Sequence, residues 1–467
     1  MAPHHHHNPL LAPLESIPDP LPLRPRPPTL GRRIPVIHPP GSKSLTNRGI
    51  LLAALAQGRS VLRRPLLDAD DTRVMLHAVQ TLGATVETHG PDLHIVGING
   101  RWKPQSQTPV TLDLHNAGTA VRFLAAAALL SPVPVTIDGT ERMRQRPIGE
   151  LGDALRNLGA TIEYPGNAGC PPIRITPPAE LPRAATLDLP RLPSSQFISA
   201  LLLLAPWLDA GLSLTSRQPV TSASYARMTL LLLSRLGATV RTSANLSVMR
   251  VGPPADSPTQ RGLPAFELDI EPDASSATYF WAAGALSSAC AVRGLPSDSL
   301  QADAHFPALL ARMGATVESA HDTTTVQPPA SLDPVFADLA DLPDAAMTLA
   351  AVACFATGRS ILRGLGTLRD KESNRIDALR TELAKIGVTI DTDVLGDPDA
   401  ITITPPDRGV DCARSCPPVH FDTYDDHRMA MSLALIGLRR PNVFINNPAC
   451  VAKTYPAFWH DFATLYE

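Results

Sequence analysis

The stretch LHAVQTLGATVE at residues 76–87 predicts the end of an amphipathic helix, a turn at Gly83 and the start of a strand. Glycine suits the left-handed conformation that often closes a helix, and the β-branched residues after it favour a strand. Similar wording occurs at four more places: LGDALRNLGATIE at 151–163, LLLSRLGATVR at 231–241, LLARMGATVES at 309–319 and LRTELAKIGVTID at 379–391.

The spacing of these five copies is nearly constant. Their glycines lie 76, 78, 77 and 73 residues apart, at Gly83, Gly159, Gly237, Gly314 and Gly387. A period of this length is longer than that of solenoid repeats and indicates an α/β unit with several strands and helices. The segment HRMAMSLALIGLRRPNVFIN at 427–446 also reads as helix, glycine and strand. The sequence therefore predicts six α/β units.

Length and charge limit the class of protein. A chain of 467 residues predicts two or three domains. The net charge of −3 argues against a general nucleic-acid or membrane-surface binder, and no apolar run approaches the ~20 residues of a membrane helix. Six dispersed cysteines suit reduced thiols, so we expect a cytoplasmic protein. The proline-rich residues 1–30 lack the apolar core of a signal peptide and are predicted to form a disordered tail.

Several apolar helices are preceded by small polar and basic residues. The free N–H groups and the dipole at a helix N-terminus suit anions. In PPGSKSLTNRGIL, residues 39–51, Lys43, Ser44 and Arg48 stand at such a start. Phosphate binding and ordinary capping by Ser44 or Thr46 are both open there.

Five further segments have the same character. Serine capping alone would explain one of them, and Asp341 with Asp344 could form a capping pair instead of a catalytic site. The residues of interest are Asn116, Gly118 and Thr119 with Arg122; Arg142, Arg144 and Arg146; Ser194, Ser195 and Gln196; Asp344; His427 and Arg428, with Asp426 as the cap; and the isolated Lys453. Together they suit small, highly anionic substrates.

The charged run RDKESNRID at 369–377 predicts a helix with two kinds of charge. On an ideal helix from Lys371 to Ile386, Glu372 lies within the apolar stripe and Arg375 at its edge, whereas Asp377 points away. We therefore expect Lys371, Glu372 and Arg375 to face the protein. A neutral proton donor and a paired structural carboxylate are both open for Glu372.

Nine segments, in this order, resemble the 5-enolpyruvylshikimate-3-phosphate synthase family, also called 3-phosphoshikimate 1-carboxyvinyltransferases. The resemblance covers about residues 34–465. The segments are PGSKSLTNR (40–48), NAGTAVRF (116–123), RMRQRPIG (142–149), SSQFISALLL (194–203), DASSATYF (273–280), PDAAMTLA (343–350), KESNRI (371–376), DDHRMAM (425–431) and AKTYP (452–456).

The resemblance implies the enolpyruvyl transferase fold, a two-domain inside-out α/β barrel of six βαβαββ repeats with three repeats in each domain. It places residues 31–41 and 264–467 in the first domain and residues 42–263 in the second, with the active site in the cleft between them. It also implies transfer of the enolpyruvyl group of phosphoenolpyruvate to the 5-hydroxyl of shikimate 3-phosphate, with release of phosphate and without a metal or organic cofactor. A monomer is expected.

The family motifs also imply roles for single residues. Asp344 matches the base for the 5-hydroxyl, and Glu372 matches the proton donor to the methylene. His427 is a helper near the departing groups, and Lys43 is a further catalytic candidate. Shikimate 3-phosphate is expected at Lys43, Ser44, Arg48, Ser194, Ser195, Gln196, Ser222, Asp344, Thr367 and Lys371. Phosphoenolpyruvate is expected at Lys43, Asn116, Gly118, Arg146, Gln196, Arg375, Arg428 and Lys453.

Three departures and two rival functions accompany this interpretation. Phe123 stands where many family members have proline, Thr367 stands where some have asparagine, and TSASYARM at 221–228 lacks the usual proline before Tyr225. A related enolpyruvyl transferase acts on UDP-N-acetylglucosamine, but the segment at 138–149 lacks its reactive cysteine. A non-catalytic anion-binding repeat protein would not need Asp344 and Glu372 together with the cations.

Overall fold

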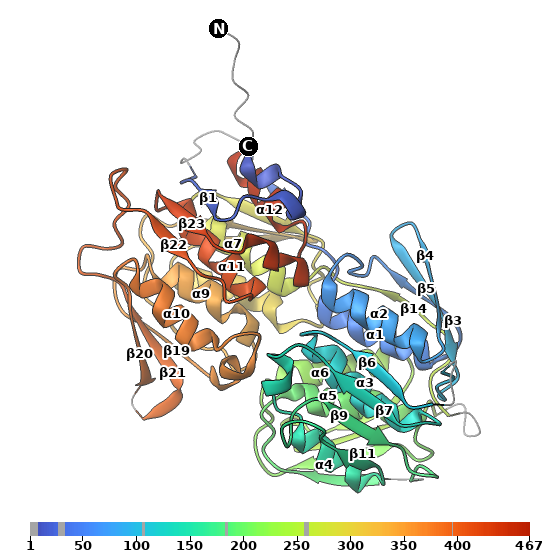
Figure 1. Ribbon diagram of the computed structural model, residues 1–467. Coiled ribbons are helices and arrows are strands. Elements are labelled where there is room, and N and C mark those ends of the chain that lie inside the picture. The colour runs from blue at the N-terminus through green and yellow to red at the C-terminus, as the bar shows by residue number, and fades with distance from the viewer. Residues whose placement is uncertain (1–7, 27–32, 105–107, 183–184, 256–260, 395) are drawn as a thin grey trace. The chain divides into compact units, whose positions relative to one another are not determined.

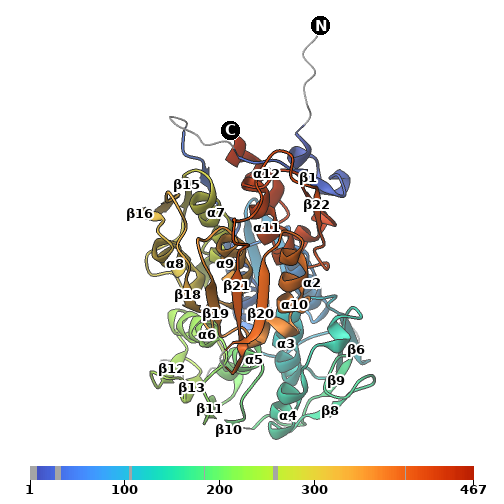
Figure 2. The same ribbon diagram turned by 90° about the vertical axis from the view of Figure 1, so that its left-hand side faces the viewer.

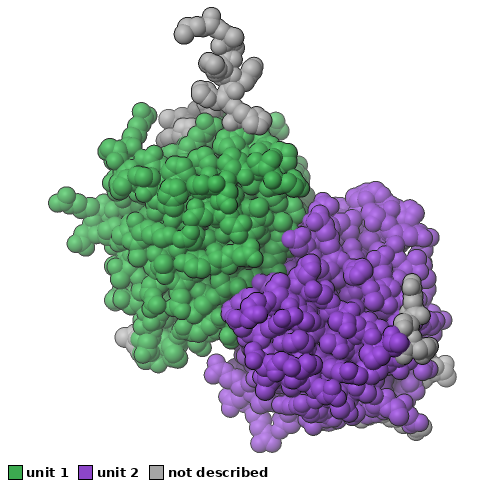
Figure 3. Space-filling view, in the orientation of Figure 1, with its two compact units in different colours: residues 1–40, 272–467 green, residues 41–271 purple. Residues whose placement is uncertain are grey.

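The computed structural model describes residues 8–26, 33–104, 108–182, 185–255, 261–394 and 396–467. The chain divides into two compact units (Figure 3). Unit 1 comprises residues 1–40 and 272–467, and unit 2 comprises residues 41–271.

Among the described residues, five of the six sheets repeat one four-stranded plan, and the sixth sheet has three strands (Figure 1). In the sheet β6–β7–β9–β8, β6 runs parallel to β7, and β9 is antiparallel to both β7 and β8. The chain passes through α3 between β6 and β7 and through α4 between β7 and β8. This is a βαβαββ unit, and the prediction of six α/β units is confirmed.

Unit 2 holds three of the sheets, each with four strands. In their spatial order the strands are β14 (Glu267–Asp269), β3 (Gln57–Arg63), β5 (Asp92–Ile98) and β4 (Thr85–His89); β6 (Val110–Asp113), β7 (Val135–Asp138), β9 (Ile173–Thr176) and β8 (Thr161–Glu163); and β10 (Ala185–Leu189), β11 (Leu212–Ser216), β13 (Val248–Gly252) and β12 (Thr239–Thr242).

Unit 1 holds the other three sheets, two with four strands and one with three. Their strands are β2 (Val36–Ile37), β15 (Cys290–Arg293), β17 (Thr323–Gln327) and β16 (Thr316–Ala320); β18 (Phe336–Asp338), β19 (Ser360–Arg363), β21 (Asp397–Thr404) and β20 (Thr389–Val394); and β1 (Leu21–Leu23), β23 (Val443–Ile445) and β22 (Val419–Phe421).

The core of each unit is built from buried helices. In unit 1 every residue of α7 (Ala274–Leu286), α9 (Ala346–Ala353) and α11 (His427–Ala434) is buried. In unit 2 most residues of α1 (Lys43–Leu55), α3 (Gly118–Ala127) and α5 (Ser195–Leu204) are buried. Such helices are apolar on all sides because they are surrounded by other elements. This arrangement of inner helices and outer sheets is the inside-out barrel that the resemblance implied.

Most of the other helices also pack on sheets. Figure 2 shows α10 beside β20, which it contacts, and α8 packs on β16. These helices are α2 (Asp70–Thr81), α4 (Gly149–Asn157), α6 (Ala223–Arg235), α8 (Phe306–Arg312), α10 (Arg375–Ala384) and α12 (Phe458–Ala463). None of the helices in the described ranges is both long and apolar enough to cross a membrane.

The repeat glycines close helices as predicted. All five have φ between 81° and 107°, the left-handed region that glycine adopts without steric cost. One buried alanine or valine then leads into β4, β8, β12, β16 and β20. The local pattern thus produces the same helix-to-strand corner five times.

One domain boundary differs from the sequence-based interpretation. The chain leaves unit 2 at residue 271 rather than 263. The reason is β14, which pairs in parallel with β3 and so completes a sheet of unit 2. Similarly, β2 pairs in parallel with β15 in unit 1. Each crossing of the chain therefore follows a strand that belongs to the unit being left.

The prediction of a disordered tail is wrong for residues 8–26. Leu21 to Leu23 form β1, which pairs antiparallel with β23. Leu10, Ile17, Leu21 and Leu23 are buried in the core of unit 1. Burial of these four apolar side chains stabilises the ordered segment, although its proline-rich composition suggested disorder. Residues 1–7 and 27–30, the rest of the predicted tail, lie outside the described residues.

Candidate active site

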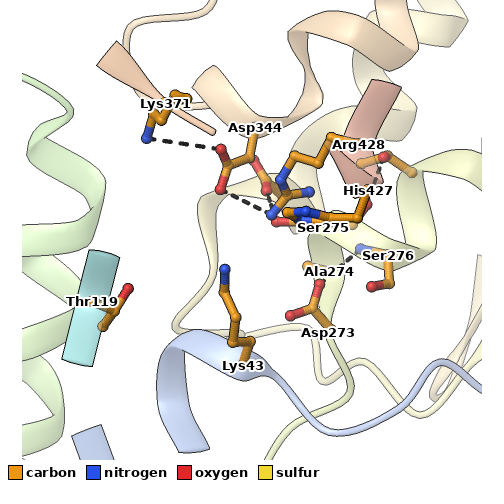
Figure 4. A network of polar contacts seen from close by, with 12 residues as sticks. Lys43, Thr119, Asp273, Ala274, Ser275, Ser276, Asp344, Lys371, His427 and Arg428 are labelled. Atoms are coloured by element: carbon orange, nitrogen blue, oxygen red, sulfur yellow. Dashed lines mark hydrogen bonds and ion pairs between the residues drawn. The ribbon is translucent and has the colours of Figure 1, made fainter. Parts of the chain in front are cut away.

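In unit 1, Asp344 lies among three cations. It sits in the 3₁₀ turn Pro343–Ala345, just before α9. Its Oδ2 accepts a hydrogen bond from Arg428 Nη2 at 2.9 Å, and its Oδ1 accepts one from Arg375 Nη1 at 3.2 Å. Lys371 Nζ lies 3.9 Å from Oδ1 (Figure 4). The alternative of a capping pair is not supported, because this turn has no side-chain cap.

Arg375 is the centre of the cluster. Its side chain is 1% exposed and reaches Asp344, Glu372 and Asp426. Burial alone would lower the pKa of Arg375, but the carboxylates of Asp426, Glu372 and Asp344 outweigh burial and raise it. The guanidinium is therefore a permanent cation within a largely buried carboxylate network.

Glu372 joins Arg375 to Lys453. Its Oε2 accepts from Arg375 Nη2 at 2.9 Å, and its Oε1 lies 4.0 Å from Lys453 Nζ at the end of the 3₁₀ segment Pro448–Lys453. The Glu372 side chain is only 8% exposed. The expectation that Glu372 faces the protein is confirmed.

The helix predicted from Lys371 begins later. Asn374 caps α10 by accepting from the Asp377 N–H, so Arg375 is the first helical residue. Lys371 and Glu372 stand in the loop before it. The apolar stripe from Ile376 to Ile386 is buried as predicted, and Asp377 forms a half-exposed pair with Arg380.

Sequence reasoning missed the full role of Asp426. It was predicted to cap α11, and its Oδ1 does accept from the Arg428 N–H at 3.0 Å. The same carboxylate also accepts from Arg375 Nε at 2.8 Å and from the Ser373 hydroxyl at 3.0 Å. Both Asp426 and His427 have fully buried side chains, with His427 Nδ1 3.7 Å from Asp426 Oδ1. The acidic doublet before His427 was the available signal.

Two more titratable groups adjoin Arg428 and were missed. Tyr279 on α7 accepts from Arg428 Nη1 at 3.4 Å, and burial raises the pKa of Tyr279 to about 12. Asp303 in the 3₁₀ turn Ala302–His305 accepts from the Ser275 hydroxyl. Burial, with the charge of Asp344, raises the pKa of Asp303 to about 7. No sequence motif marks these two residues as neighbours of Arg428.

In unit 2, the first residues of α1 have different partners. Lys43 Nζ lies 3.2 Å from Asp71 Oδ2 on α2. Arg48 is buried and donates to the Ser44 carbonyl, to Thr229 Oγ1 and to Ser199 Oγ. Burial lowers the pKa of Arg48 to about 10, so it remains a cation at neutral pH. Arg48 thereby links α1 to α5 and α6.

The start of α3 combines a helix N-terminus with a buried arginine. Arg146 Nη1 donates to Asn116 Oδ1 at 3.2 Å. A Cβ atom added at Gly118 would lie 2.7 Å from Arg146 Nη2, so any larger residue would displace this guanidinium. Backbone N–H groups and an arginine at one helix start can bind an anion.

The start of α5 is capped as the simpler alternative predicted. Ser194 Oγ accepts from the Gln196 N–H at 3.2 Å. The Gln196 amide donates to Thr119 Oγ1 at 3.4 Å, which connects this helix start with that of α3. Ser195 and Ser222 are buried, and Ser222 precedes α6 with φ 49°.

Other candidates lie apart from these contacts. Arg144 pairs with Asp138, and Arg142 donates to Gln145. Thr367 Oγ1 is buried without a hydrogen-bond partner among the described residues. Phe123 is buried, and the central carbon of the Arg48 guanidinium lies over the Phe123 ring, 5.2 Å from the ring centre.

Comparison with known families identifies the family to which the chain belongs. The family EPSP synthase (3-phosphoshikimate 1-carboxyvinyltransferase) matches residues 34–462. The chain belongs to the EPSP synthase family. A 3-phosphoshikimate 1-carboxyvinyltransferase from Laribacter hongkongensis is 43% identical over 432 residues, which cover 91% of this chain and 95% of the relative. One from Burkholderia lata is 40% identical over the same shares.

Solved structures show the same fold. EPSP synthase from Acinetobacter baumannii aligns with a TM-score of 0.72 at 24% identity, over 94% of this chain and 96% of that one. The enolpyruvyl transferase NikO from Streptomyces tendae aligns with a TM-score of 0.70 at 18% identity, over 96% and 98%. At these identities the likeness concerns the fold alone.

Proposed function

We propose that this chain, as a member of the EPSP synthase family, is a 3-phosphoshikimate 1-carboxyvinyltransferase. It transfers the enolpyruvyl group of phosphoenolpyruvate to the 5-hydroxyl of shikimate 3-phosphate and releases phosphate. The observation that carries the proposal is the cluster of Asp344 and Glu372 with Lys371, Arg375, Arg428 and Lys453. Both substrates carry a phosphate and a carboxylate, so a set of fixed cations suits them.

The unit 1 cluster supports separate roles for the two carboxylates. Asp344 takes the proton of the 5-hydroxyl as the oxygen attacks C2 of phosphoenolpyruvate. Glu372 gives a proton to the methylene carbon, which becomes a methyl group in the tetrahedral intermediate. Glu372 then takes back one methyl proton, and Asp344 gives its proton to the departing phosphate, which restores the double bond. Each carboxylate ends the cycle in the form in which it began.

The cations also regulate these carboxylates. Arg375 and Arg428 bind Asp344, and Arg375 and Lys453 lie beside Glu372. Anionic groups of phosphoenolpyruvate compete for the same cations. Their arrival weakens the hold on Asp344, which frees it as a base, and makes protonation of Glu372 less costly.

Unit 2 supplies the other proposed contacts. Arg146, Asn116 and Gly118 form the anion site at the start of α3 and bind phosphoenolpyruvate. Lys43, Ser44, Arg48, Ser194, Ser195, Gln196 and Ser222 bind shikimate 3-phosphate, with Lys43 and Gln196 touching both substrates. Thr367 stays a prediction. The monomeric state and the cytoplasmic location expected from the sequence also stay predictions.

Phosphate release tests the proposal. Purified protein mixed with phosphoenolpyruvate and shikimate 3-phosphate is expected to release phosphate in proportion to enzyme. Replacing shikimate 3-phosphate by UDP-N-acetylglucosamine is expected to abolish release. Binding of shikimate 3-phosphate without phosphate release would identify a non-catalytic binding protein, and release only with the nucleotide sugar would identify the other transferase.

A further inference from the structure

The turn before α11 has an unusual backbone. The Asp426 N–H donates to the Thr423 carbonyl at 2.9 Å and closes a four-residue turn. Both central residues have positive φ, 56° for Tyr424 and 54° for Asp425. Turns with two such positions favour Asn-Gly, because other side chains are strained there. A tyrosine and an aspartate in these places need support from contacts outside the turn.

Glu382 on α10 supplies that support from one side. Its side chain is fully buried. Its Oε2 accepts from the Asp422 backbone N–H at 2.8 Å, and its Oε1 accepts from the Tyr424 hydroxyl at 2.7 Å. Lys385 Nζ bonds Glu382 Oε2 at 2.7 Å and Asp422 Oδ2 at 2.9 Å. Burial, followed by the bond to Glu382, raises the pKa of Tyr424 to about 12, so its hydroxyl donates throughout the neutral range.

The segment after β23 holds the turn from the other side. Asn446 Nδ2 donates to Asp422 Oδ1 at 2.6 Å, and Asn447 Nδ2 donates to Asp425 Oδ1 at 3.2 Å. These amide contacts are exposed. The contacts of Glu382 are the better shielded ones, so their loss is expected to matter more.

The turn ends at the carboxylate that holds both arginines of the cluster. Asp426 directly follows Asp425 and accepts from Arg375 Nε and from the Arg428 backbone N–H. Arg375 and Arg428 in turn donate to Asp344. A change in the backbone at Tyr424 therefore moves Asp426 and, through it, the Arg375 guanidinium and the start of the helix that carries Arg428.

We propose that Glu382 is a positioning residue for the two arginines: by fixing the left-handed turn at Tyr424 and Asp425, it sets where Asp426 holds Arg375 and Arg428. This inference rests on the proposed function, in which the arginines bind phosphoenolpyruvate. The Glu382 side chain is fully buried and is not among the groups proposed to touch a substrate. If Glu382 only paired with Lys385 to stabilise α10, its replacement would leave KM for phosphoenolpyruvate unchanged.

The decisive variant is Glu382→Gln. The amide keeps the shape of the side chain, but its NH₂ group opposes one of the three donors that the carboxylate now accepts from. We expect KM for phosphoenolpyruvate to rise about tenfold or more, whereas the dissociation constant of shikimate 3-phosphate stays within about twofold. Hydrogen exchange at the Asp422 and Arg428 amides is expected to quicken by a similar factor.

Two further variants complete the design. Tyr424→Phe removes one hydroxyl from a side chain that is 43% exposed and is expected to fold. It should raise KM for phosphoenolpyruvate by about threefold. Arg380→Gln breaks the half-exposed pair with Asp377 on the same helix and is the control, with no expected change in either KM or exchange.

The outcomes separate this inference from the proposed function. Lack of turnover in the wild type would refute the function, and amide exchange would still show whether Glu382 orders the turn. Folded Glu382→Gln protein with an unchanged KM for phosphoenolpyruvate would overturn the inference, as would equal weakening of both substrates. If Glu382→Gln does not fold, an unchanged KM in Tyr424→Phe overturns it.

Discussion

Asp426 binds Arg375 through two parallel hydrogen bonds, from Nε to Oδ2 at 2.8 Å and from Nη2 to Oδ1 at 3.2 Å, although the two residues are 51 positions apart. Both side chains are almost completely buried. Removing one partner of such a pair leaves a buried charge without compensation.

Asp426→Asn is therefore expected to lower the free energy of unfolding of unit 1 by about 3–5 kcal/mol. Urea unfolding measures the change. The control is Asp322→Asn, which breaks a pair with Arg293 in which both side chains are at least half exposed. Its expected effect is below about 1 kcal/mol. Equal changes in the free energy of unfolding would show that burial does not increase the contribution of the Asp426–Arg375 pair to stability.

Glu372→Gln tests the proposed proton donor. The amide fits the same space but cannot give a proton to the methylene carbon. We expect phosphate release to slow by about two orders of magnitude or more, while both substrates bind nearly as in the wild type. Single-turnover phosphate release and equilibrium binding measure the two effects. Wild-type turnover in this variant would rule out Glu372 as the donor.

Gly118→Ala tests the anion site at the start of α3. The added methyl group would lie 2.7 Å from Arg146 Nη2 and would displace the guanidinium. KM for phosphoenolpyruvate is expected to rise about tenfold, the effect of a weakened charged hydrogen bond. Gly358→Ala is the control, because its nearest contact would be an ordinary 3.6 Å. An unchanged KM in Gly118→Ala would contradict the assignment of Arg146.

Asp303→Asn tests the effect of the buried carboxyl on stability. The pKa of Asp303 is raised from 3.8 to about 7 in the folded protein, so the folded state binds this proton more tightly than the unfolded state. This contribution to stability is complete below about pH 4 and is lost as pH rises through about 7, by about 1.4 kcal/mol for each pH unit between. The asparagine variant lacks it.

Urea unfolding of both proteins at pH 5 and pH 8 provides the measurement. The stability of the wild type relative to Asp303→Asn should fall from pH 5 to pH 8. A difference that is independent of pH, or one that grows with pH, would show that Asp303 is ionised in the folded protein throughout.

The ordered N-terminal segment predicts a contrast between two leucines. Leu21→Ala removes a fully buried side chain from β1 and should cost about 2–5 kcal/mol in free energy of unfolding. Leu11→Ala changes a side chain that is 48% exposed and should cost less than about 1 kcal/mol. Thermal unfolding distinguishes them. Similar melting temperatures for both variants would mean that β1 does not contribute to the core.

The amino-acid sequence by itself determined the repeated architecture. Helix, glycine and β-branched residues are local signals, and their even spacing predicted six α/β units. The apolar stripe from Ile376 to Ile386 also follows from local periodicity, whereas Glu372 faces the protein from the loop before the helix, where that periodicity does not apply. The starts of α1, α3 and α5 could likewise be read directly, since those positions depend on neighbours in the chain, whereas the start of α10 was placed too early.

Only the tertiary structure decided which charges meet. Arg375 binds Asp344 and Asp426, and Glu382 reaches Tyr424, over separations of 31 to 51 residues that no local pattern encodes. The start of α10 at Arg375 depends on the Asn374 cap, which competes with continuation of the helix toward Lys371. Residues 8–26 are ordered because β23 offers a strand edge and the core of unit 1 accepts their leucines. Such pairings depend on distant surfaces, and those exist only once the chain has folded.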